Sequence, residues 1–116
     1  MNNPTQIKLR RAENLLEIHF EDGSTASLPA ELLRVESQSA EVQGHGPGQQ
    51  ILIAGKKQIA ITGIEPTGNY AIRLTFSDGH DTGIYTWDFL HQLGREQNIR
   101  WRRYLRRLEE AGLNRG

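Results

Sequence analysis

The chain has 116 residues, a mass of 13.2 kDa and a formal net charge of zero, which suits one domain over residues 1–116 that buries a core without metal or disulfide staples. Because it has no cysteine, a disulfide scaffold, a thiolate zinc site, a cysteine-ligated iron–sulfur cluster and a cysteine nucleophile are excluded. No stretch approaches a signal peptide core or the roughly 20 apolar residues of a membrane span, so we expect a cytoplasmic protein without membrane contact.

Charge is unevenly distributed along the chain. Residues 12–48 hold seven acidic side chains against the single Arg34, whereas residues 95–107 hold six arginines against Glu96. Such polarity indicates an interaction between unlike surfaces, either with a partner protein, with a second copy of the chain, or between the two halves of one copy. The charge distribution is therefore also compatible with a homo-oligomer.

The first third of the chain predicts three strands. Alternating apolar residues favour strands at 6–12 and 14–24, and a third short strand enters a helical turn across 25–34, with Pro29 at the first helical position. The Asp-Gly pair at 22–23 predicts a hairpin turn. Periodicity is then lost from 35 to 50, where the segment GHGPGQQ is typical of a surface loop.

The second half predicts further strands and a helical end. Strands are expected at 51–55, 59–68, 70–79 and 82–87, followed by a short helix that ends near Gly94 and a second that stops at Gly112. Tyr85 and Trp87 are expected in the core. The second helix should bury one stripe: Trp101, Tyr104, Leu105 and Leu108.

The predicted class is α+β: a mixed, mainly antiparallel β-sheet domain, with a short helix after strand three and a C-terminal helix packed on the sheet.

The segment SDGHD, residues 77–81, supports two interpretations. As a hairpin tip, Asp78 caps the turn, Gly79 takes a positive φ, and His80 and Asp81 lie in solvent. As a functional site, its two carboxylates and one imidazole could hold zinc or iron or transfer protons. We favour the turn; the alternative is a small metal-binding protein with ligands drawn from His80, His45, Asp78 and Asp81.

The arginine-rich C-terminal segment raises nucleic-acid binding as another alternative. Arg100, Arg103 and Arg107 share one helical face, and Trp101 and Tyr104 could stack on bases. The aromatic residues lie on the apolar stripe, however, and the net charge is zero. We therefore favour an acidic protein surface as the partner of these arginines.

The sequence does not match the motifs of phosphate- or dinucleotide-binding loops, or that of serine hydrolases. The glycine-rich segment 44–50 lacks the Lys-Ser/Thr ending of a phosphate loop and the strand–loop–helix context of a dinucleotide site. Ser37, Ser39 and Ser77 lack the flanking glycines of a nucleophile elbow, so a serine hydrolase is not indicated.

Two stretches carry a family resemblance: LLRVESQSAEVQGHGPGQ, residues 32–49, and NYAIRLTFSDGHDTGIYTWDFLHQLG, residues 69–94. With them the chain resembles, from about Ile7 to Gly112, the small bacterial proteins grouped as gamma-butyrobetaine hydroxylase-like N-terminal domains. In larger eukaryotic hydroxylases this domain precedes an iron- and 2-oxoglutarate-dependent catalytic domain and carries a zinc site of three cysteines and one histidine.

The resemblance implies a degenerate zinc site. The three cysteine positions of the motif fall on Ser37, Ser39 and Val42, and the histidine falls on His80. Neither serine nor valine supplies a thiolate, so we expect no metal and no cofactor. We also expect no enzymatic activity, because these 116 residues leave no room for the catalytic jelly roll.

The expected function is a non-catalytic adaptor domain that binds a protein, in the context that the resemblance offers: iron–sulfur protein assembly or an oxygenase partner. Segments 37–50 and 77–85 should form one surface. In place of the metal, it should be closed either by hydrogen bonds among Ser37, Ser39, Asp78 and His80 or by packing of Val42, and Arg34 should pair with Asp78 or Asp81. The predicted partner-binding residues are Arg34, Ser37, Ser39, His45, Asp78, His80, Asp81, Arg100, Arg103 and Arg107.

Overall fold

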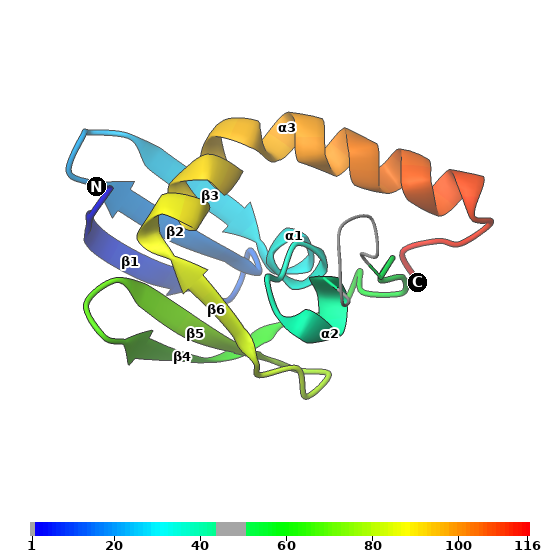
Figure 1. Cartoon of the computed structure of the whole chain (residues 1–116), viewed down its shortest axis with the longest axis horizontal. Helices are drawn as coiled ribbons and strands as arrows, with labels where there is room; N and C mark the ends of the chain where they lie inside the picture. The colour runs from blue at the N-terminus through cyan, green and yellow to red at the C-terminus, as the bar shows by residue number, and fades with distance from the viewer. Residues whose placement is uncertain (1, 44–50) are drawn as a thin grey trace.

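Six strands form two antiparallel three-stranded sheets in the computed structural model, which describes residues 2–43 and 51–116 (Figure 1). The first sheet has the order β1 (Pro4–Arg10), β2 (Leu15–Phe20), β3 (Thr25–Pro29), and the second has the order β4 (Ile61–Thr67), β5 (Ala71–Phe76), β6 (Gly83–Thr86). In both sheets each strand pairs with the next one along the chain. The structure thus has two small meanders where the sequence suggested one mixed sheet.

Three helices complete the described part of the fold: α1 (Ala30–Val35), α2 (Ala40–Gln43) and α3 (Trp87–Glu110). The α+β class, with a short helix after the third strand and a C-terminal helix packed on β-structure, is confirmed. In Figure 1, α3 crosses the molecule, with its first half beside β3 and its second half extending past α1.

Period-two alternation places the core between the elements. On β2, Leu16, Ile18 and Phe20 are buried while their neighbours are only half-buried, and β5 repeats the pattern at Leu74 and Phe76. The two predicted Asp-Gly turns are present, since Gly23 and Gly79 have φ values of 87° and 90°. Sequence alternation therefore identified the strands that contribute most to the core.

The C-terminal helix is continuous through Gly94, so the prediction of two helices with a break there is wrong. The helix begins where the Thr86 hydroxyl accepts the Phe89 amide at 3.1 Å. Gly94 lies on the face that packs against β3, where a Cβ at this position would come within 2.8 Å of the Ala26 Cβ. The glycine permits close helix–sheet packing, and the helix stops before Gly112, as expected.

The predicted strand at 51–55 is also wrong. This segment has no strand partner among the described residues, because its polar groups contact α3 and the C-terminal tail instead. The Tyr104 hydroxyl donates to the Ile53 carbonyl at 2.6 Å, and the Gly55 amide donates to the Asn114 carbonyl at 3.0 Å. The apolar stripe of α3 is narrower than predicted, since Leu105 is exposed and Trp101 only half-buried.

The two oppositely charged halves of the chain contact each other within one copy. Arg100 on α3 pairs with Glu36 at 2.9 Å. The tail residue Arg115 pairs with the buried Glu31 at 2.7 Å. One of the three interpretations of the charge polarity, pairing within the chain, is thus present in the structure. Within residues 2–43 and 51–116, no helix combines the length and apolar character that crossing a bilayer requires.

Candidate functional site

A buried polar contact joins the segment after α1 to the hairpin between β5 and β6. The Ser37 hydroxyl lies 3.1 Å from Nε2 of His80, and both side chains are buried. The prediction that His80 lies in solvent is wrong, whereas Asp81 is exposed as predicted. His80 is drawn inward because the hairpin folds against the chain that leaves α1.

Hydroxyl groups extend this contact. The Ser37 hydroxyl accepts the Ser39 amide at 3.2 Å, and the Ser39 hydroxyl lies 2.6 Å from that of Thr82 on the hairpin. The segments expected to lie side by side do so at residues 37–39 and 80–82. Thr82 was not predicted, and only its position next to Asp81 in the hairpin could have indicated it.

Asp78 is the ionic centre of the hairpin. Its carboxylate accepts Nε of Arg34 at 2.8 Å, Nζ of Lys56 at 2.7 Å and the backbone amide of His80 at 3.0 Å. Burial raises the pKa of Asp78, but the hydrogen bonds from Lys56, the His80 amide and Arg34 outweigh it and hold that pKa well below its usual range. The expected pairing of Arg34 with Asp78 is present. No sequence pattern predicted the contact between Lys56 and Asp78.

The residues at the four zinc positions do not fit zinc. Val42 is buried and apolar, Ser37 and Ser39 offer neutral hydroxyls, and Nε2 of His80 lies at hydrogen-bond distance from Ser37. Asp78 is held by two cations, and Asp81 lies 4.0 Å from Arg73. In the part of the chain that the structure describes, no three His, Asp or Glu side chains are grouped to hold a metal. His45 lies outside the described residues.

The three predicted arginines of α3 differ in their surroundings. Arg100 forms two ion pairs, since its Nη1 lies 2.9 Å from the Glu36 carboxylate and its Nε lies 2.9 Å from that of Glu96. Its side chain is only 13% exposed. Arg103 is exposed and Arg107 half-buried, and neither has an ion-pair partner among residues 2–43 and 51–116. The available positive charge of this face is thus carried by Arg103 and Arg107.

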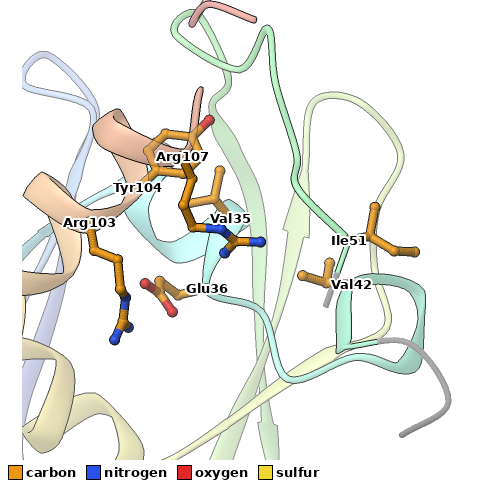
Figure 2. A pocket seen from close by; sticks show the side chains of 7 residues that line it. All are labelled: Val35, Glu36, Val42, Ile51, Arg103, Tyr104 and Arg107. Atoms are coloured by element: carbon orange, nitrogen blue, oxygen red, sulfur yellow. The ribbon is translucent and has the colours of Figure 1, made fainter. Parts of the chain in front are cut away.

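Arg103 and Arg107 line a small pocket between α1, α2, the segment at Ile51 and α3 (Figure 2). In the figure Arg107 reaches from α3 toward α2 and Ile51, while Arg103 extends beside Glu36. The pocket has a volume of about 20 Å³. The remaining lining residues are Val35, Val42 and Tyr104.

Tyr104 closes the inner wall of the pocket. It is 4% exposed, and burial raises its pKa to about 12, so its hydroxyl stays protonated and donates to the Ile53 carbonyl. This bond fixes the segment that carries Ile51 against α3. Neither Ile51 nor Glu36 was a predicted site residue; Glu36 lies 64 positions from Arg100, a separation that no local pattern reports.

The two aromatic residues assigned to the core have different environments. Tyr85 is fully buried and its hydroxyl donates to the Leu33 carbonyl, which confirms that prediction. Trp87 is half-buried, donates Nε1 to the Asn69 carbonyl at 2.9 Å, and lines an open hollow of about 190 Å³ with Tyr70. The core assignment of Trp87 is therefore only partly right.

The fold and the site define a small α+β domain with two meanders, whose motif segments are joined by a buried serine–histidine contact. A family model described as gamma-butyrobetaine hydroxylase-like, N-terminal matches residues 7–91, and the chain belongs to this family. The suspected resemblance is thereby confirmed. No curated protein matches the chain.

Several solved structures are similar to the chain, among them the following three. Two NMR solution structures have 43% and 46% sequence identity and TM-scores of 0.86 and 0.85; each alignment covers 99% of this chain, with 90% and 86% of theirs. A crystal structure from Acidithiobacillus ferrooxidans, of a protein of unknown function in the DUF971 family, has 37% identity and a TM-score of 0.66 over 79% of this chain and 92% of its own. The chain is thus a small domain of a family whose function is unknown.

Proposed function

We propose that this chain is a non-catalytic adaptor domain that binds another protein. The observation that carries the proposal is the pocket in Figure 2, where the motif segment at residues 35–43 meets two arginines of α3 that have no ionic partner in the described chain. The sequence suggested two separate binding surfaces, the segment after α1 and the arginine face of α3. Both contribute residues to this one pocket.

The size of this pocket supports a protein rather than a small molecule as its ligand. Small-molecule sites have volumes of roughly 300–1,000 Å³ and enclose most of their ligand. A pocket of about 20 Å³ accepts the tip of one side chain, with the rest of the ligand lying on the surface around it. Protein interfaces commonly place one anchoring side chain in such a depression.

The Ser37–His80 pair supports a structural role for the hairpin contact. A hydroxyl at 3.1 Å from an imidazole nitrogen has the spacing of a nucleophile and its base. Ser37 is fully buried, however, and its hydroxyl also accepts the Ser39 amide. A substrate could not reach Ser37 without opening the hairpin, so we assign the pair to holding residues 37–39 in place beside the pocket.

Site-specific photocrosslinking in the native cell tests the proposal. A photoreactive amino acid placed at Ile51, which is 50% exposed at the pocket, should crosslink a distinct protein, whereas the same group at the exposed Thr62 on β4 should not. Mass spectrometry of the crosslinked protein would show whether it is an iron–sulfur assembly protein, an oxygenase or a second copy of the chain. Equal crosslinking at both positions would contradict the proposal.

Metal analysis supplies an independent check of the non-catalytic adaptor role. Protein purified without a histidine tag should contain no stoichiometric zinc or iron. Metal bound at one ion per chain and lost in the variant His80→Ala would contradict the proposal and favour a metal-binding protein.

A further inference from the structure

We infer that the pocket between α1, α2 and α3 binds an acidic peptide segment through one of the segment's aliphatic side chains and its neighbouring carboxylates. This inference rests on the proposed function and names the chemistry of the partner. The pocket has two parts, a floor of Val42 and Tyr104 with Ile51 beside it, and a cationic rim of Arg103 and Arg107.

The floor of the pocket suits one aliphatic side chain. Val42 is 2% exposed and Tyr104 is 4% exposed, so packing holds both side chains in place at the base of the pocket, and the half-exposed Ile51 forms the outer wall. A volume of about 20 Å³ is little more than the roughly 10–15 Å³ that admits a single water, so the pocket admits one methyl group and excludes an aromatic ring. A terminal methyl group of leucine, isoleucine or valine is the group that such a space accommodates.

The rim of the pocket suits carboxylates. Arg103 and Arg107 lie four residues apart on α3, so their side chains leave the same face of the helix about one turn apart. Among the described residues of the lining, the acidic side chain is that of Glu36, which is already paired with Arg100 at 2.9 Å. The two remaining guanidinium groups therefore give the rim a net positive charge, and guanidinium groups bind carboxylates through paired hydrogen bonds.

The same surface does not suit single-stranded nucleic acid, for which stacking on exposed aromatic rings contributes much of the affinity. Tyr104 is buried and its hydroxyl is engaged by the Ile53 carbonyl. The guanidinium of Arg115 lies 5.1 Å from the ring centroid of Trp101, on which it stacks. Neither of the aromatic rings that suggested base stacking in the sequence is open beside Arg103 and Arg107.

Selection from a displayed library of random peptides against the full chain tests the inference. Selected peptides should carry Asp or Glu within four residues of Leu, Ile or Val. Their synthetic versions should bind by fluorescence anisotropy, with an affinity that falls as salt is raised and falls again when each acidic residue is replaced by its amide.

A matched pair of variants locates the binding. The double variant Arg103→Gln/Arg107→Gln should weaken the binding of the selected peptides roughly tenfold, because two exposed or half-buried ion pairs are lost. The control Arg102→Gln/Arg106→Gln removes the same charge from exposed positions of the same helix and should change affinity less than twofold. Both variants should keep the wild-type circular dichroism spectrum and melting temperature.

Three results would overturn the inference: no enrichment of acidic peptides, equal loss of affinity in the two double variants, or tighter binding of an oligothymidine probe than of any selected peptide. These results are distinguishable from failure of the adaptor role. If Ile51 still crosslinks a cellular protein while acidic peptides are not selected, the proposed function stands and the chemistry inferred for its partner is wrong.

Discussion

Asp78 holds the β5–β6 hairpin against the rest of the domain, and the substitution Asp78→Asn tests how much this contact contributes. The carboxylate accepts three hydrogen bonds of 2.7–3.0 Å, two of them from Lys56 and Arg34. The variant keeps an oxygen for the His80 amide but leaves Arg34 facing a neutral group. The Arg34 side chain is 11% exposed, and its Nη1 already has no hydrogen-bond partner among the described residues.

The expected loss is about 3 kcal/mol in the free energy of unfolding at pH 7. Breaking a buried ion pair costs roughly 3–5 kcal/mol, and we take the lower end because Lys56 is 24% exposed and regains water. For a domain of this size each kcal/mol lowers the melting temperature by about 4 °C, so the variant should melt about 12 °C lower. Urea denaturation followed by circular dichroism measures the difference directly.

The pH dependence supplies a second measurement. Because the folded state holds the pKa of Asp78 below its unfolded value of about 3.9, the ionised carboxylate stabilises the fold above that pH. This stability is lost as the pH falls through the lower folded pKa. The difference between wild type and variant should therefore be constant above about pH 5 and shrink in stronger acid.

The neighbouring exposed Asp81 provides the control. Asp81→Asn removes a carboxylate from the same hairpin, but its nearest cation, Arg73, lies 4.0 Å away at the surface. It should cost less than about 0.5 kcal/mol. Equal losses in the two variants, or a difference between wild type and Asp78→Asn that does not change down to pH 2, would refute the assignment of Asp78 as the ionic centre.

Three further predictions concern packing, the tail and the zinc positions. Gly94→Ala should lower stability by about 1–2 kcal/mol in urea denaturation, because the 2.8 Å approach to the Ala26 Cβ outweighs the higher helix propensity of alanine; an unchanged or raised stability would contradict it. Arg115→Gln should cost about 2–3 kcal/mol by the same assay, since it leaves the buried Glu31 without its cation; a loss below about 0.5 kcal/mol would show that Glu31 finds another partner. A triple cysteine variant should bind one zinc per chain by metal analysis and lose it when His80→Ala is added; absence of zinc would remove the degenerate-site interpretation. The positions changed to cysteine are Ser37, Ser39 and Val42.

Local sequence patterns predicted the strands and turns whose conformation depends mainly on residues close together in the chain. Alternation marked the buried residues of β2 and β5, and the positive φ of Gly23 and Gly79 placed two turns. The prediction of a helix end near Gly94 failed because the role of this glycine depends on Ala26, which is distant in sequence and adjacent only after folding. The prediction of a strand at 51–55 failed because the apolar residues of this segment favour a strand, whereas its backbone polar groups contact the tail.

The candidate site was predictable only in outline. The family motif placed Ser37 and His80 together, and the structure brings them to 3.1 Å. The burial of His80, the bond from Lys56 to Asp78 and the pairing of Arg100 with Glu36 depend on three-dimensional packing between distant segments. The sequence therefore indicated which segments meet, and the structure was needed to show which of their side chains are already engaged.

The contact between Arg115 and Glu31 has a consequence for synthesis of the chain. The two residues are 84 positions apart, and the tail that carries Arg115 also pairs with the backbone of Gly55 and Lys57. During translation Glu31 therefore leaves the ribosome long before Arg115 does. Folding of this domain should be completed only once Arg115 has left the exit tunnel, and a nascent chain stalled before that point should be more readily cut by proteases than one in which Arg115 has emerged.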